Sequence, residues 1–274
     1  MRKTKSNAVL VIIAALIAIM MTSCSGERKA AVSAYDAECV RISSELDSLK
    51  ETIQESQALI DLKEKPYDEN TVTALEALIS ESSSSITEVP KMKGSAVEIM
   101  ELVNNELKYI SYAEENKRLS SAKNDLENSI KIMKQVTAPD EAFVIERIKN
   151  IETITGYAGV TEENDPNGNL NKPGGYTSTV YFASNQIKGN NLSQSNEKII
   201  ENGTEGGGAI EVYATEEDAK NREEYLASFD GSFLSSGSHK VVGTIVIRTS
   251  DLLTASQQQA LEKQIVENLI ELRD

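Results

Sequence analysis

Between residues 27 and 155 the apolar positions recur with helical spacing. From about Glu27 to Lys65 they alternate at intervals of three and four, which is typical of the seam of a coiled coil or a narrow helical bundle. The seam positions are Val32, Tyr35, Cys39, Ile42, Leu46, Leu49, Ile53, Ser56 and Ile60. Pro66 ends the predicted helix, because the residue before a proline avoids helical backbone angles.

Three further helices are predicted before the pattern changes. They cover about Asp68 to Val89, Ser95 to Thr137 and Asp140 to Thr155, and the last of them has Asp140 as its N-cap. The stripe of the long middle helix shifts phase after Ile110, since Glu114 and Lys117 would otherwise fill the seam. This shift predicts a stutter or a change of packing partner.

After Gly156 the chain becomes rich in glycine and asparagine, and its apolar runs become β-branched. Residues 156–176 are predicted to form a linker or loop. Strands are predicted at Thr177–Ala183, Ala209–Tyr213 and Lys240–Arg248. Helices are predicted at Thr215–Phe229 and Thr254–Leu272, with Thr215 and Thr254 as their N-caps. The predicted fold is therefore a helical coiled-coil-like bundle or stalk (27–155), followed by a small α+β domain (177–274) with about three strands and two helices.

The N-terminus has the features of an export signal. A basic start (Arg2, Lys3 and Lys5) precedes an uncharged apolar run of about 14 residues from Ala8 to Met21, which is shorter than a bilayer span. The following residues, Met-Thr-Ser-Cys24, resemble the lipobox of bacterial lipoproteins. This resemblance implies that residues 1–23 are a signal peptide, that residues 24–26 begin the mature chain, and that Cys24 carries the lipid. The alternatives are an ordinary cleaved signal and an uncleaved anchor helix.

The charge of the chain restricts its partners. The formal net charge is −15, and the export signal contains only basic charges, so the mature part is still more acidic. Such a surface repels nucleic acid and anionic lipid. Cys39 is the only other cysteine, which excludes a disulfide framework within the monomer. We expect Cys39 to be a small apolar residue of the seam; the alternative is a thiol that crosslinks two copies.

The C-terminal region contains five characteristic segments: GGAIEVY (207–213), YLASFDG (225–231), SGSH (236–239), GTIVIRTS (243–250) and LTASQQ (253–258). Together they resemble a domain found in lipoproteins of gut- and host-associated Gram-positive bacteria. The resemblance covers about Gly156 to Asp274. It implies a lipoprotein with a helical N-terminal region and carries no site residues with it.

Candidate chemical sites are few. Asp165, Asn167, Asn169 and Asn171 alternate as in a calcium loop, but the glycine and glutamate of that motif are not in place, so a turn-rich loop is the main expectation. Gly206–Gly208 lack the residues of a phosphate-binding loop and are expected to lead tightly into a strand. His239 is the only histidine, too few for zinc, and no nucleophile elbow is present. We therefore expect no catalytic residues, metal or cofactor.

The predicted function is that of a non-enzymatic, lipid-anchored protein on the extracytoplasmic face of the cell membrane, or of the outer membrane if the host has two. Its C-terminal domain would contact envelope or cell-wall components, and the helical region would allow self-association. The alternative is an envelope enzyme or its regulator, with a glycan- or peptide-binding site around Tyr176, His239 and Arg248.

Overall fold

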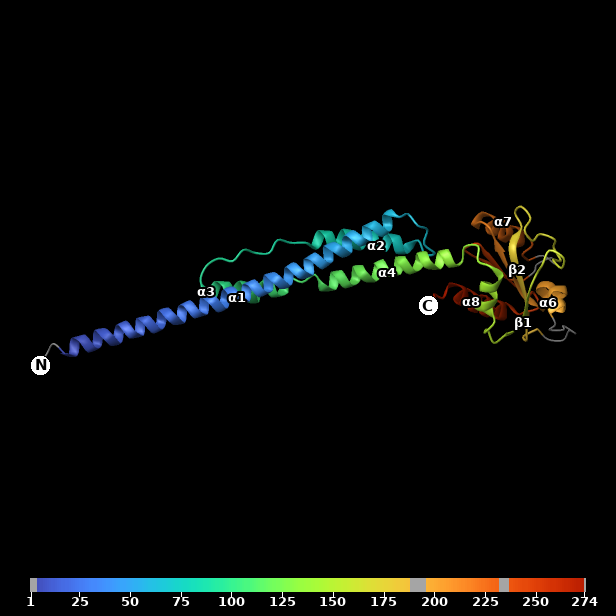
Figure 1. Ribbon diagram of the computed structural model, residues 1–274. Helices are drawn as coiled ribbons and strands as arrows, with labels where there is room; N and C mark the ends of the chain where they lie inside the picture. Colours follow the sequence, from blue (N-terminus) through green and yellow to red (C-terminus); the bar gives the residue numbers. More distant parts are fainter. Residues whose placement is uncertain (1–3, 188–195, 232–236, 274) are drawn as a thin grey trace. The chain divides into compact units, whose positions relative to one another are not determined.

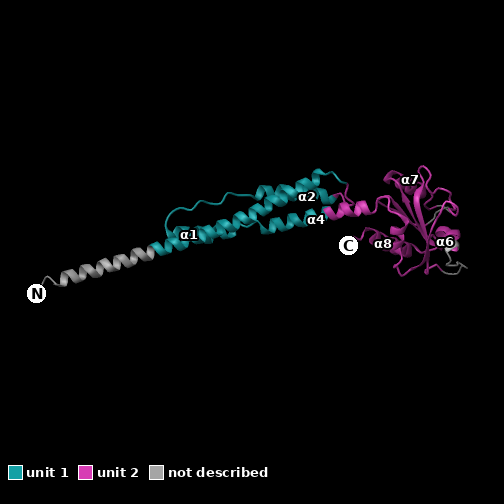
Figure 2. Cartoon of the chain, in the orientation of Figure 1, with its two compact units in different colours: residues 1–64, 70–126 teal, residues 65–69, 127–274 magenta. Residues whose placement is uncertain are grey.

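The chain forms two compact units, one helical and one of mixed α and β structure. The computed structural model describes residues 4–187, 196–231 and 237–273, and of residues 4–24 and 196–197 only the backbone path is described. Unit 1 comprises residues 1–64 and 70–126, and unit 2 comprises residues 65–69 and 127–274 (Figure 2). The predicted signal peptide and Cys24 lie outside the residues whose side chains are described. Among the residues with described side chains, no helix is long and apolar enough to cross a membrane.

Unit 1 is helical, which confirms the predicted helical N-terminal region. Its elements are α1 (Thr4–Asp61), α2 (Asn70–Ser85), α3 (Ala96–Asn105), the short helix η1 (Leu107–Tyr109) and the start of α4 (Ala113–Gln135). Figure 1 labels α1 to α4. Helix α1 packs against α2 and α3. Three seam positions at seven-residue spacing, Ile42, Leu49 and Ser56, are fully buried. The heptad pattern of α1 therefore does mark its packing face.

The long helix predicted from Ser95 to Thr137 is instead interrupted between α3 and α4. Arg41 of α1 donates hydrogen bonds to the carbonyl oxygens of Leu107 (3.0 Å) and Ile110 (2.9 Å) at this break. Glu45, one turn further along α1, accepts the backbone N–H of Tyr112 at 2.9 Å. These two side chains satisfy backbone groups that a continuous helix would have bonded internally. The phase shift in the sequence thus marks a real break in the helix.

Unit 2 contains a five-stranded antiparallel sheet rather than the predicted three strands. The sheet order is β1-β2-β3-β5-β4. Its strands are β1 (Ile154–Gly159), β2 (Tyr176–Ser184), β3 (Gly207–Tyr213), β4 (His239–Val242) and β5 (Ile245–Thr249). Its helices are the end of α4, α5 (Glu141–Ile148), α6 (Asn196–Asn202), α7 (Glu216–Ala227) and α8 (Ala255–Ile270), with the short helix η2 at Gly203–Gly206.

The two additional strands come from two errors in the predicted elements. The helix expected to reach Thr155 ends at Ile148, and Ile154–Gly159 form β1, which pairs with β2 and takes up the start of the predicted 156–176 linker. The run Lys240–Arg248, expected as one strand, is a hairpin of β4 and β5 that turns at Gly243 and Thr244. Gly243 has a φ of +60°, which glycine adopts without strain. A glycine inside an apolar run was the signal for this turn.

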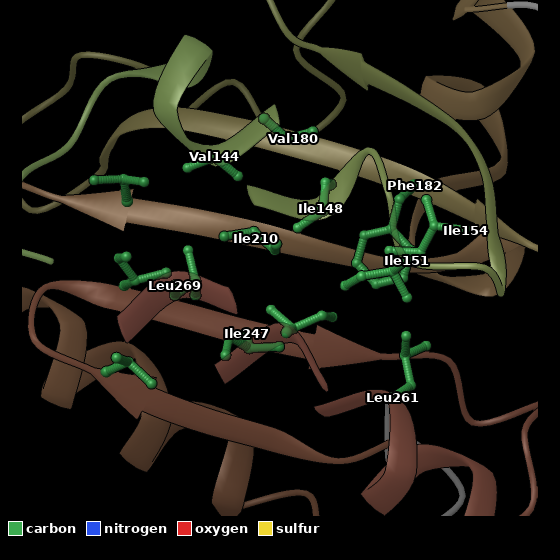
Figure 3. Packing of buried hydrophobic residues seen from close by; sticks show 14 of the residues in the cluster. Val144, Ile148, Ile151, Ile154, Val180, Phe182, Ile210, Ile247, Leu261 and Leu269 are labelled. Atoms are coloured by element: carbon green, nitrogen blue, oxygen red, sulfur yellow. The ribbon is translucent and has the colours of Figure 1, made fainter. Parts of the chain in front are cut away.

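Helices cover both faces of the sheet. On one face α5 and α8 pack over alternate residues of the strands, and the labelled side chains of this core interlock in Figure 3. On the other face α6 and α7 cover a second core around Tyr181, Ala209 and Val246. The alternation along β3 is clear, because Ile210 and Val212 belong to the first core whereas Ala209 and Tyr213 belong to the second.

The hairpin turn gives a test of the corrected fold. A Cβ at Gly243 would lie 2.5 Å from the carbonyl oxygen of Val136, in addition to the positive φ. We predict that Gly243→Ala lowers the free energy of unfolding by about 3 kcal/mol. Gly231 is the matched control, because its φ is +72° but no residue that the structure describes lies within 4 Å of its Cβ position. Gly231→Ala is expected to cost only about 1 kcal/mol. Equal losses in urea unfolding would contradict the close approach of the turn to Val136.

Candidate ligand-binding cleft

A carboxylate buried in the middle of the sheet organises the α7 side of unit 2. Glu211 lies on β3, between β2 and β5, and is fully buried. Arg222 of α7 binds both of its oxygens, with Nε at 2.8 Å from Oε2 and Nη2 at 2.9 Å from Oε1. Arg248 of β5 donates from Nη1 to Oε1 at 2.9 Å, and the hydroxyl of Tyr213 donates to Oε2 at 2.9 Å. One buried carboxylate thus ties α7 to β3 and β5.

These partners keep Glu211 ionised. Burial alone would raise the pKa of Glu211, but the hydrogen bond from Arg222 and the charges of Arg248 and Arg222 hold it below its usual range. Burial and the charge of Glu211 raise the pKa of Tyr213, so its hydroxyl stays protonated and remains a donor. The cluster carries two guanidinium groups for one carboxylate.

Helix α7 carries a polar face at helical spacing. Asp218, Asn221, Arg222 and Tyr225 lie at positions i, i+3, i+4 and i+7 and therefore share one side of the helix. Thr215 is the N-cap, as predicted, and its hydroxyl accepts the backbone N–H of Asp218 at 3.1 Å. The cap fixes where the helix begins, and the bond from Arg222 to Glu211 fixes its rotation.

A second carboxyl, which is only half-buried, organises the loop before β2. Asp165 accepts the backbone N–H groups of Asn167 (3.0 Å), Asn169 (2.7 Å) and Leu170 (2.8 Å), and the hydroxyl of Tyr176 also donates to it. Burial would raise the pKa of Asp165, but the bond from Tyr176 and the backbone donors hold it below its usual range. Since four donors bond to its oxygens, Asp165 is the centre of a turn-rich loop, as predicted.

The polar face of α7 and this loop enclose a cleft of about 500 Å³, a size typical of small-molecule sites. Tyr176 and Tyr213 are buried at its base, where their rings meet edge to face with centroids 6.4 Å apart. Tyr225 is 57% exposed at its rim. The complete lining is Asn167, Asn169, Pro173, Gly174, Gly175, Tyr176, Tyr213, Asp218, Asn221, Arg222 and Tyr225.

The structure places the three residues singled out in the sequence in three different settings. Tyr176 lines the cleft. Arg248 is buried beneath it and reaches it only through Glu211. His239 lies on β4 and lines a different pocket, where its ring is 3.3 Å from both Glu223 and Asp230. The cleft therefore includes Tyr176, is supported by Arg248 and does not involve His239.

Sequence reasoning singled out Asn167, Asn169 and Tyr176 but missed Glu211 and the residues that α7 contributes to the cleft. The polar face of α7 was readable, because its four residues have helical spacing. Glu211 was also readable as an acid inside the apolar run Ala209–Tyr213, a position that requires a buried partner. Its pairing with Arg222 and Arg248 depends on the tertiary fold and has no sequence signal.

No protein-family model matches this chain, and neither a curated protein nor a solved structure is similar to it. The cleft must therefore be interpreted from its own chemistry.

The Glu211 cluster gives a prediction about stability. Glu211→Gln removes the charge that balances two buried guanidinium groups, and we expect it to lower the free energy of unfolding at pH 7 by about 3–5 kcal/mol. The control is Glu216→Gln, which breaks an exposed ion pair with Lys65 and should cost under about 1 kcal/mol. Urea unfolding followed by circular dichroism measures both changes.

The same variant also tests the pH dependence. Because the pKa of Glu211 is lower in the folded than in the unfolded chain, its ionised form stabilises the fold above about pH 4.3, the usual glutamate value. That stabilisation is lost as the pH falls through the folded-state pKa. The native chain should therefore lose stability more steeply than Glu211→Gln below about pH 4.3. Parallel curves would contradict an ionised Glu211.

Proposed function

We propose that this chain is a non-enzymatic, lipid-anchored surface protein whose C-terminal α+β unit recognises envelope or extracellular components through the cleft. The observation that carries the proposal is the cleft itself, which gathers polar side chains from α7 and the 165–176 loop around a rigid aromatic base. In this proposal the helical region is a coiled-coil-like stalk between the lipid on Cys24 and the recognition unit.

The chemistry of the cleft favours binding over turnover. Glycoside hydrolysis requires a carboxyl group whose pKa is raised so that it can donate a proton at neutral pH. Glu211, the carboxyl beneath the cleft, has a lowered pKa and is bonded to Arg222, Arg248 and Tyr213. This arrangement supports a structural role for Glu211. The alternative, an envelope enzyme or its regulator, receives no comparable support from it.

The anchor has a direct test. Cys24→Ser removes the proposed acceptor of the lipid, so we expect the protein to leave the membrane fraction and to stop incorporating labelled palmitate. Cys39→Ser is the control and should change neither property, because Cys39 lies in the helical seam. Membrane retention of the Cys24→Ser variant with no incorporated label would point to an uncleaved anchor helix.

The recognition role is tested with solubilised wall and membrane fractions. We expect the full chain to bind material from these fractions. Tyr225→Ala and Asn221→Ala should each bind it at least about tenfold less strongly, since each variant removes one contact from the cleft. Lys220→Ala serves as the control, because Lys220 is exposed on α7 but does not line the cleft. Equal retention by all four proteins would contradict recognition through the cleft.

A further inference from the structure

The polar atoms left unengaged in the cleft are both donors and acceptors. Within the described part of the chain, Nη1 of Arg222 has no hydrogen-bond acceptor, and Oδ1 of Asp218 has no donor. Asn167 uses its amide nitrogen on the hydroxyl of Tyr181 at 3.1 Å, which leaves its oxygen as an acceptor. The side-chain amides of Asn169 and Asn221 supply one donor group and one acceptor each.

This mixture selects the type of ligand group. A carboxylate or phosphate only accepts hydrogen bonds, so it would meet the oxygens of Asp218 and Asn167 without a donor of its own. An ammonium group only donates hydrogen bonds and carries a positive charge, so the guanidinium of Arg222 would repel it. A hydroxyl both donates and accepts, and neighbouring hydroxyls can satisfy Asp218 and Arg222 together.

The charge around the cleft also disfavours an anionic ligand. Glu216, Glu217, Glu223 and Glu224 lie on the same helix as Asp218, and the whole chain has a net charge of −15. Such a field lowers the local concentration of anionic polymers. An uncharged ligand is unaffected by it.

The position of the cleft in the sheet disfavours an extended peptide. Peptides commonly bind by adding a strand to a free sheet edge. Tyr176 and Tyr213 at the base of the cleft pair with each other across β2 and β3. The carbonyl oxygen of Tyr176 accepts the N–H of Asn171, and the N–H of Tyr213 donates to the carbonyl oxygen of Thr244. These backbone groups are engaged within the unit, which disfavours strand addition at the base of the cleft.

The rim of the cleft carries an aromatic face. Tyr225 is 57% exposed, and its ring is held by the guanidinium of Arg222, 5.6 Å from the ring centroid. An exposed, supported ring offers a flat apolar surface beside hydrogen-bonding groups. A pyranose ring has the matching form, with C–H groups on a face and hydroxyls around the edge.

We propose that the cleft binds an uncharged glycan, with pyranose hydroxyls bonded to Asp218, Asn221 and Arg222 and a sugar ring stacked on Tyr225. This inference rests on the proposed function and adds the chemical class of the ligand. The ligand would be either a wall glycan of N-acetylhexosamine units or an extracellular polysaccharide of neutral hexoses. Both present the pyranose rings and hydroxyls that the cleft would recognise.

Isothermal titration calorimetry on the full chain in detergent tests this proposal with four probes. These are an N-acetylglucosamine tetramer, a glucose tetramer, a galacturonate tetramer and a neutral alanine–glycine tetrapeptide. We expect saturable binding of at least one of the first two, and which one binds identifies the source. Tyr225→Ala and Asn221→Ala should each weaken that binding about tenfold. Lys220→Ala, at a residue exposed on α7 outside the cleft, should leave it within about twofold.

The outcomes separate the ligand class from the proposed function. Cleft-dependent binding of the galacturonate or the tetrapeptide, without a neutral sugar, would overturn the glycan assignment and keep recognition through the cleft. Binding of a neutral sugar that Tyr225→Ala leaves unchanged would overturn the placement in the cleft. If no probe binds, the glycan assignment is wrong. The separate retention experiment with wall and membrane fractions then decides whether the proposed function holds.

Discussion

The α7 side of unit 2 depends on the hydrogen bonds and ion pairs made by the ionised side chain of Glu211. An isolated carboxylate in the centre of a sheet would be strongly unfavourable, and here two guanidinium groups and a tyrosine hydroxyl compensate its burial. The partners come from β5, α7 and β3 itself, so they fix the helix against the sheet. Arg222 is therefore both a structural residue and a cleft residue, since one end of its guanidinium is held by Glu211 and the other is left for a ligand.

The opposite wall of the cleft follows the same principle. Asp165 is held by three backbone N–H groups and the hydroxyl of Tyr176, which gives a loop without regular structure a defined shape. A Cβ at Gly175 would lie 2.0 Å from the carbonyl oxygen of Asn169, so the loop folds back closely on itself. Both walls are thus positioned before any ligand arrives, and this preorganisation reduces the entropic cost of binding.

Local signals in the sequence predicted the seam of α1 and the caps Asp140, Thr215 and Thr254, all of which are found in the structure. The extent of the helices was predicted less well, because Ile151 continues the helical spacing of Val144 and Ile148 although α5 ends at Ile148. The apolar run around Gly243 suits one strand as well as two. The Glu211 cluster was beyond sequence reasoning, because residues 11 and 37 positions from Glu211 meet only after the sheet and α7 have packed.

In the proposed function, α7 and the 165–176 loop together form the recognition surface of the protein. Hydrogen–deuterium exchange on the full chain, with and without the neutral oligosaccharide that binds most tightly, tests this most directly. Recognition through the cleft predicts slower exchange on binding in residues 165–176 and 216–227, with no change in α1–α3. Protection confined to α1–α3, or to the pocket beside His239, would contradict it.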